Sequence, residues 1–65
     1  MIISRVKETM EGQGVTMREL MSRTGLSMQT VNRARGPMIA RCTLETLATI
    51  AAALGVKVKA LFEEE

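Results

Sequence analysis

The 65-residue chain contains no histidine, aspartate, tyrosine or tryptophan, and its only cysteine is Cys42. A general base that works near neutral pH would therefore have to be a glutamate or a lysine in an unusual environment. A single thiol excludes an internal disulfide and a cysteine-based zinc cluster. Residues 12–14 lack the third glycine of a dinucleotide loop, and no glycine is followed by Gly-Lys-Ser/Thr. The composition thus argues against an enzyme and predicts no cofactor and no metal site.

Aromatic residues and long apolar runs are also scarce. Phe62 is the one aromatic residue, and no run approaches the roughly 18 apolar residues of a membrane span. The first five residues are too short, and Arg5 comes too early, for a signal peptide. We therefore expect a cytoplasmic chain that makes no membrane contact.

Apolar residues make up 46% of the chain and recur with helical rather than strand periodicity. Sixty-five residues form one small domain, residues 1–65, which buries only about 60% of the surface of its unfolded chain. The fold class expected is all-α, with an aliphatic core. The core predicted from the sequence is Ile2, Ile3, Val6, Leu20, Leu26, Val31, Leu44, Leu47, Ile50, Leu54, Val58 and Leu61.

Residues 16–24 carry the signals of a well-defined helix start. Thr16 and Glu19 have the spacing of a capping box, in which each side chain bonds the backbone amide of the other residue. Val15 and Leu20 flank the cap as a hydrophobic staple. Gly25 stands where this helix must end, because glycine adopts the left-handed backbone of a C-terminal turn without strain.

A second capped helix follows within three residues. Ser27 is its predicted cap, with Leu26 before it and Val31 four residues after it. Gly36 and Pro37 end the helix, since proline disfavours helical angles at the residue before it. Two capped helices joined by so short a turn predict a helix-turn-helix over residues 16–36.

The second helix has two unlike faces. At about 100° per residue, Val31 and Ala34 share one face. The side chains on the opposite face and its flank are Met28, Gln29, Asn32 and Arg33. Glutamine and asparagine pair with adenine, arginine pairs with guanine, and methionine can touch a thymine methyl. This face therefore predicts base reading in the major groove of double-stranded DNA.

The positive charge is concentrated in the part of the chain that holds this motif. Residues 1–41 carry seven cations against three glutamates, whereas residues 42–65 carry two lysines against four glutamates. All five cations between residues 16 and 41 are arginines, whose planar fork suits phosphate oxygens. Arg35 lies nearer the packed face, and Arg41 lies in the loop before the next helix. For any one arginine, a merely solvated side chain remains the alternative.

The sequence resembles the Cro/C1-type helix-turn-helix regulators, also called the XRE family, which have the lambda-repressor-like fold. Gly25, Leu26, Ser27 and Val31, with the spacing between the two caps, are the most specific part of the resemblance. Residues 6–8 and 14–16 resemble the first helix and its exit, residues 44–56 resemble the fourth helix, and residues 57–62, KVKALF, resemble the closing short helix.

The resemblance implies a compact bundle of five short helices, with the helix-turn-helix at the second and third. It implies transcription regulation by a homodimer, usually a repressor, at a pseudo-palindromic operator. In that setting the residues expected to hold the DNA backbone are Thr16, Met17, Arg18, Ser27, Thr30, Arg35 and Arg41. The protein would then be associated with a prokaryotic nucleoid or encoded by a phage or prophage.

Three positions depart from the family pattern. Met17 stands where the family often has a phosphate-binding glutamine, so that contact falls to backbone amides or to Arg18. Met21 replaces a usual alanine, and Ala34 replaces a usual large aliphatic residue. We interpret the second pair as an exchange of size that keeps the core volume constant.

Alternatives remain open. An antitoxin or another protein-interaction module could use the same fold and touch DNA secondarily, although an antitoxin usually needs an added segment and this sequence stops after the closing helix. Cys42 is expected to be a small buried hydrophobe, with redox sensing as the alternative. Residues 63–65 are expected to be a frayed acidic end, with a partner contact as the alternative. Loops are expected at residues 12–15 and 36–42.

Overall fold

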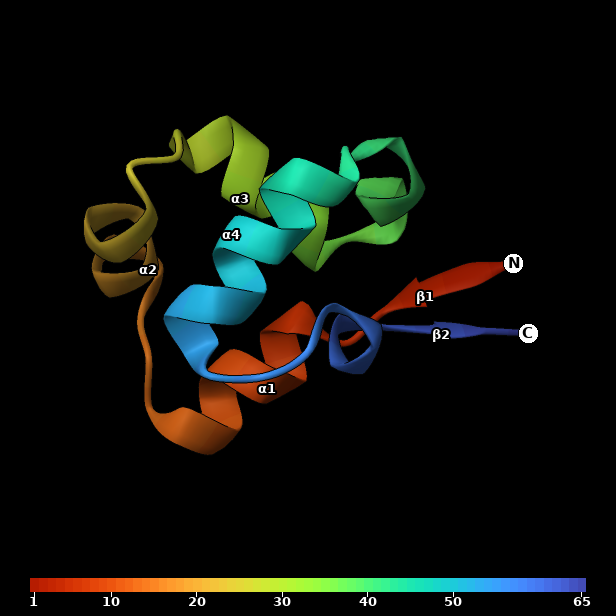
Figure 1. Ribbon diagram of the computed structural model, residues 1–65, viewed down its shortest axis with the longest axis horizontal. Coiled ribbons are helices and arrows are strands. Elements are labelled where there is room, and N and C mark those ends of the chain that lie inside the picture. Colours follow the sequence, from red (N-terminus) through yellow and green to blue (C-terminus); the bar gives the residue numbers. More distant parts are fainter.

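The computed structural model describes residues 1–65 as four α-helices with two short 3₁₀ helices and two short strands (Figure 1). The α-helices are α1 (Val6–Gln13), α2 (Met17–Thr24), α3 (Met28–Arg35) and α4 (Leu44–Leu54). The 3₁₀ helices are η1 (Pro37–Arg41) and η2 (Val58–Leu61), and the strands are β1 (Ile2–Ser4) and β2 (Phe62–Glu64). The predicted helical class is confirmed. The predicted count of five is wrong, because the closing segment forms a single 3₁₀ turn instead of an α-helix.

Both predicted caps of the helix-turn-helix are present. The hydroxyl of Thr16 accepts a hydrogen bond from the amide of Glu19 at 3.1 Å, and the Glu19 carboxylate accepts one from the amide of Thr16 at 3.3 Å. Ser27 caps α3 by accepting from the amide of Thr30 at 3.2 Å. Gly25 ends α2 with a left-handed φ of 73°. The local signals therefore set the bounds of α2 and α3 as predicted.

A single cluster of twelve buried apolar residues forms the core. Helix α4 packs against α1 and α2, and η2 covers part of α4. In Figure 1, α4 crosses the middle of the molecule with the other helices around it. The buried residues are Val6, Met10, Val15, Leu20, Val31, Ala34, Ile39, Leu47, Ile50, Ala51, Leu54 and Leu61. None of the helices has the length and apolarity that crossing a membrane requires.

Leu44 and Ile39 are the clearest corrections to the predicted core, from which the buried residues Met10, Val15, Ala34 and Ala51 were also missing. Leu44 was expected inside but is 74% exposed, because it is the first residue of α4 and the buried part of that helix begins at Leu47. Ile39 was not expected inside but is only 1% exposed. It lies in the predicted loop over residues 36–42, most of which is the 3₁₀ helix η1, begun by Pro37. Four other predicted core residues, Ile2, Ile3, Leu26 and Val58, are half-buried.

Residues 12 and 13 correct the other predicted loop. They belong to the last turn of α1, which ends at Gly14 in the left-handed conformation, with a φ of 68°.

The two ends of the chain pair as a small antiparallel sheet, which the sequence did not predict. The register places Ile2 opposite Glu64 and Ser4 opposite Phe62. Arg5 forms an ion pair with Glu63 at 2.6 Å, and this hydrogen-bonded carboxylate raises the pKa of the Arg5 guanidinium above its usual value. The expectation of a frayed acidic end is therefore wrong. Three residues per strand are too few for alternation to be recognised, and the partner of the acidic end lies at the other end of the sequence.

Candidate nucleic-acid interface

The angle between α2 and α3 is fixed by the short turn that joins them. The hydroxyl of Thr24 donates to the carbonyl of Leu20 at 2.7 Å and accepts from the amide of Leu26 at 3.2 Å. The amide of Gly25 donates to the carbonyl of Met21 at 2.8 Å. These bonds satisfy backbone groups that the end of α2 would otherwise leave free. The turn therefore holds α3 in a defined orientation on the core.

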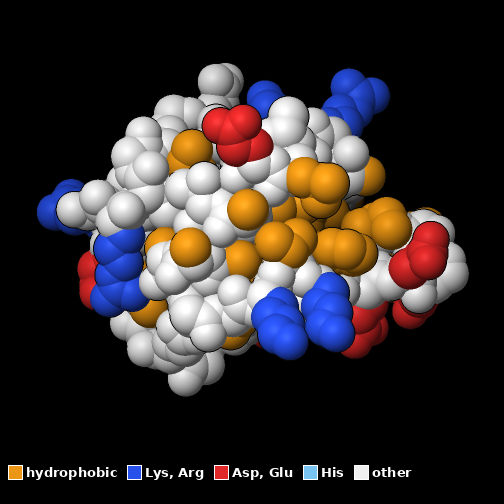
Figure 2. Space-filling model, viewed as in Figure 1, with side chains coloured by type: hydrophobic (Ala, Val, Ile, Leu, Met, Phe, Trp, Pro, Cys, Tyr) orange, Lys and Arg blue, Asp and Glu red, His pale blue; other side chains and the backbone are white.

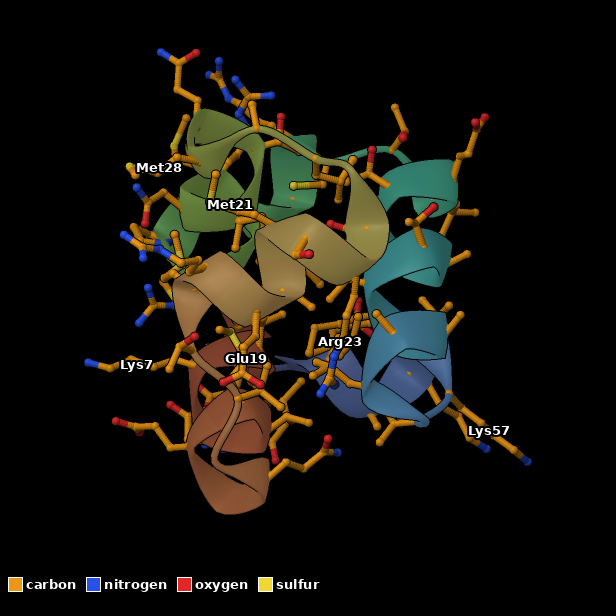
Figure 3. The ribbon with its side chains drawn as sticks, turned by 90° about the vertical axis from the view of Figure 1, so that its left-hand side faces the viewer. Lys7, Glu19, Met21, Arg23, Met28 and Lys57 are labelled. Carbon is orange, nitrogen blue, oxygen red and sulfur yellow. The ribbon has the colours of Figure 1, made fainter.

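Helix α3 has the two faces that its phase predicts. Val31 and Ala34 are fully buried. Met28, Gln29, Asn32 and Arg33 are all exposed, and in Figure 3 Met28 points away from the body of the molecule. No acidic residue lies on α3. The structure thus brings the four predicted base-reading side chains onto one open face.

Ser4 fixes the other end of α3, a role that the sequence analysis did not predict. Its hydroxyl donates to the carbonyl of Ala34 at 2.6 Å, which ties β1 to the last turn of the helix. The only available signal was a serine near the start of the chain, thirty residues away from its partner in the sequence.

The predicted backbone contacts other than the arginines lie at the starts of α2 and α3. Thr16 and Ser27 are exposed at the starts of α2 and α3, where free amides and the helix dipole favour a phosphate. Thr30 is half-buried, and its hydroxyl lies 3.0 Å from that of Ser27. Met17 is half-buried against the core, so only its backbone amide is suited to a phosphate.

The arginines differ in how freely they can move. Arg18, Arg33 and Arg41 are exposed, and none of them forms an ion pair. Arg35 is half-buried, with its Nε buried and without a hydrogen-bond partner. Arg23 is held toward α4, because it donates to the carbonyl of Ala53 in that helix at 3.4 Å. It also lies 3.6 Å from the carboxylate of Glu19 in its own helix (Figure 3). The guanidinium groups of Arg18, Arg33 and Arg41 are therefore free to bind a partner, and that of Arg33 belongs to the open face of α3.

Cys42 lies between α3 and α4 in the sequence and is half-buried. Burial raises the pKa of its thiol, while the nearby charge of Arg33 lowers the pKa to a smaller extent. A raised pKa keeps the thiol protonated and slow to react at neutral pH. No group of three or more cysteine, histidine or acidic side chains is placed to hold a metal ion.

Comparison with known proteins places nearly the whole chain in one family. A family model described as the Cro/C1-type HTH DNA-binding domain matches residues 5–64. The matched range contains all four α-helices and every residue predicted to contact DNA. A search of curated proteins finds no significant match.

Proposed function

The chain belongs to the Cro/C1-type helix-turn-helix DNA-binding family, and from this premise we propose that it is a homodimeric transcriptional repressor. It reads a pseudo-palindromic operator through the major groove, acts by binding instead of catalysis, and works in the cytoplasm of a prokaryotic cell. The observation that supports this proposal most strongly is the exposed face of α3, which carries no acidic residue. Helix α3 is capped by Ser27 and follows α2, which is capped by Thr16.

The exposed residues of α3 would divide the base reading among them. Gln29 and Asn32 suit adenine, and Arg33 suits guanine, because each can form two hydrogen bonds to that base. Met28 suits the methyl group of thymine. Together these four side chains specify a few base pairs, which is too short a site for one copy to be selective in a genome.

The backbone contacts would set the register of α3 in the groove. We assign them to the side chains of Arg18, Arg35 and Arg41 and to the amides exposed at the starts of α2 and α3. The free amides are those of the first two residues of each helix, directly after the caps Thr16 and Ser27, and include the amide of Met17. The amide of Thr30 is already bonded to the hydroxyl of Ser27. These contacts fix position and contribute to affinity, and they carry no direct sequence information.

Selection of sites from random duplex DNA tests the proposal. The purified protein is incubated with the DNA at about 0.15 M salt, because affinities depend steeply on salt concentration. We expect an enriched two-fold motif whose half-site centres lie about 34 Å, or one DNA turn, apart. The absence of any enriched sequence would contradict the proposal and favour the protein-interaction alternative.

Two substitutions distinguish base contacts from backbone contacts. Gln29→Ala is expected to relax the preference at one base pair, at a loss of about 1–3 kcal/mol for the preferred base. Arg41→Ala is expected to weaken all sequences alike and to reduce the salt slope by about one. Arg23→Ala is the matched control, because Arg23 is held toward α4, and it should leave the salt slope unchanged. An unchanged base preference in Gln29→Ala would overturn the assigned orientation of α3.

A further inference from the structure

Helix α3 ends differently from the other three α-helices. Helices α1, α2 and α4 each end at a glycine with a left-handed backbone, whose amide donates back into the helix. Gly36, which follows α3, has an extended backbone with a φ of −120°, and its amide donates to the carbonyl of Arg33 only at 3.4 Å. The next residue is Pro37, which has no amide hydrogen. The backbone after α3 therefore supplies fewer donors than the four carbonyls at the end of a helix require.

The carbonyl of Ala34 obtains its donor from a distant part of the chain. Ala34 is fully buried, so water does not reach this carbonyl. The hydroxyl of Ser4 donates to it at 2.6 Å, across thirty positions of the sequence. A buried carbonyl without a partner is costly, because it loses its hydrogen bond to water and gains none in return. Ser4 therefore acts as a C-terminal cap for α3.

The same hydroxyl also serves the start of α1. The amide of Val6, the first residue of α1, donates to Ser4 Oγ at 3.3 Å. The side chain of Arg5 forms no cap at this position. A hydroxyl has one donor and two acceptor lone pairs, so both bonds can form together. Ser4 thus joins the start of α1 to the end of α3.

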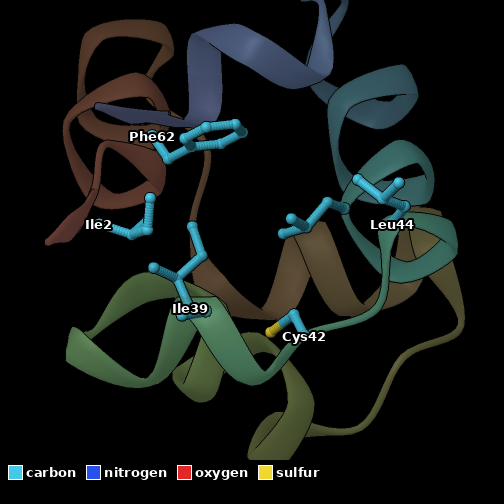
Figure 4. A pocket seen from close by; sticks show the side chains of 7 residues that line it. Ile2, Ile39, Cys42, Leu44 and Phe62 are labelled. Atoms are coloured by element: carbon cyan, nitrogen blue, oxygen red, sulfur yellow. The ribbon is translucent and has the colours of Figure 1, made fainter. Parts of the chain in front are cut away.

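The strand that carries Ser4 is held firmly on its other side. Ser4 lies opposite Phe62 in the pairing of β1 with β2. Ile2, two residues before it, lines an apolar recess together with Ile39 and Phe62 (Figure 4). Hydrophobic side chains also gather on the surface beside the strands (Figure 2). The position of Ser4 is therefore set by contacts that do not involve α3.

Little else connects β1 to α3. The bond from Ser4 is the only hydrogen bond between the two elements, and no ion pair joins them. A cleft of about 280 Å³ lies between β1 and the end of α3, where its lining residues are Arg35, Gly36 and Pro37. The Nε of Arg35 has no hydrogen-bond partner and so does not brace this end. Without the Ser4 bond, the last turn of α3 would have room to move.

We propose that Ser4 is a positioning residue for base reading, which holds the last turn of α3 at the angle that Arg33 needs to meet its base. Arg33 directly precedes Ala34 and is exposed on the reading face. Gln29 lies in the first turn, which the cap formed by Ser27 holds separately. The proposal rests on the proposed function. Loss of the Ser4 bond should disturb reading by Arg33 more than reading by Gln29.

Competition between duplexes that differ from the selected operator at one base pair tests this proposal. Arg33→Ala and Gln29→Ala first identify the base pair that each side chain reads. Ser4→Ala is expected to reduce the preference at the Arg33 base pair by about three- to tenfold, the effect of one hydrogen bond. It should leave the preference at the Gln29 base pair nearly unchanged. In the Arg33→Ala background, Ser4→Ala should have no further effect at that base pair, because it acts through Arg33.

Two further variants at Ser4 show whether the hydroxyl is responsible. Ser4→Thr keeps a hydroxyl and should restore the preference of the original protein. Ser4→Cys replaces the hydroxyl by a thiol, which is a weaker donor, and should give an intermediate loss. The cysteine variant also keeps the test usable if the alanine variant is only partly folded, which circular dichroism measures.

Gln13→Ala is the matched control. The Nε2 of Gln13 donates to the carbonyl of Leu54 at 2.7 Å, so it also joins a distant side chain to the end of a helix. This helix is α4, which carries no base-reading residue. Gln13→Ala should lose a similar amount of stability and leave every base preference unchanged. The comparison separates the positioning of α3 from a general loss of stability.

Amide hydrogen exchange without DNA measures the cap directly. In Ser4→Ala, the amides in the last turn of α3 should exchange at least about threefold faster relative to those of α4. In Gln13→Ala, the last turn of α3 should exchange as in the original protein. This measurement does not depend on whether the protein selects a DNA sequence.

Three results would overturn the positioning role. The first is an unchanged preference at the Arg33 base pair in Ser4→Ala. The second is an equal loss at every base pair, and the third is a failure of Ser4→Thr to restore the preference. Any of these, alongside successful selection of an operator, would leave the proposed function standing. A protein that selects no sequence would overturn the proposed function and the reading role of Ser4 together, and faster exchange in Ser4→Ala would then retain only its role as a cap.

Discussion

Replacing Ile39 with alanine is expected to destabilise the fold far more than replacing Leu44 with alanine. Both residues are large aliphatics close together in the sequence, but Ile39 is 1% exposed and Leu44 is 74% exposed. Truncation of a buried isoleucine to alanine leaves a cavity and costs about 2–5 kcal/mol. An exposed substitution of this kind changes stability by about 0.5 kcal/mol or less. At about 0.05–0.15 kcal/mol per residue, the free energy of unfolding of the whole domain is only about 3–10 kcal/mol. The loss of Ile39 would therefore remove a large part of it.

Urea unfolding followed by circular dichroism measures the difference. It is performed at low protein concentration, so that self-association does not contribute to the stability. Ile39→Val is the graded control, with an expected loss of about 0.5–1.5 kcal/mol. In thermal unfolding, each kcal/mol lost from the free energy of unfolding should lower the Tm by about 4–8 °C for a domain of this size. Equal losses for Ile39→Ala and Leu44→Ala would refute the placement of η1 against the core.

Three other substitutions follow from the structure. Gly25→Ala should destabilise by about 1–2 kcal/mol through the left-handed backbone alone, since no neighbouring atom lies within 4 Å of the added Cβ, whereas Gly12→Ala inside α1 should stabilise. Because burial raises the pKa of the Cys42 thiol, the thiol ionises at a lower pH in the unfolded chain than in the folded one. The free energy of unfolding measured in urea should therefore fall from about pH 8 to about pH 10, and it should fall less in Cys42→Ala. Met21→Ala and Ala34→Ile should compensate each other when combined, and simple additivity of their unfolding free energies would contradict the proposed exchange of size.

The sequence predicted the helix-turn-helix well because its signals are local. Thr16 and Glu19 lie three residues apart, and their reciprocal bonds form in the helix start itself. Gly25 and Ser27 act within one turn of their own positions. No distant contact is needed to place these elements, so short-range physical chemistry suffices.

Features that depend on distant contacts were not predicted. Ile39 appeared to lie in a loop because Gly36 and Pro37 precede it, and only the packing shows that its side chain is buried in the core. Leu44 appeared to belong to the core because it continues the apolar spacing of α4, and only the end of the bundle shows otherwise.

The candidate site divides in the same way. The helical phase of α3 predicted which side chains are exposed, and this is confirmed for all four base-reading candidates. The phase did not predict that Ser4 anchors the last turn of α3, or that Arg23 is held toward α4. Which base each side chain contacts stays a prediction, because it depends on a partner molecule outside the chain.

The pairing of β1 with β2 also has a consequence for the order in which the chain folds. It pairs Ile2 with Glu64, at nearly opposite ends of the sequence, and closing a loop of this length becomes favourable only after the intervening helices have compacted. The ends should therefore be the last part to form and the first to open, while α2 and α3 stay in place. Opening would separate Ile2 and Phe62, which line one apolar recess together with Ile39 and Leu44. Amide hydrogen exchange in β1 and β2 should therefore be faster than in α2 and α3.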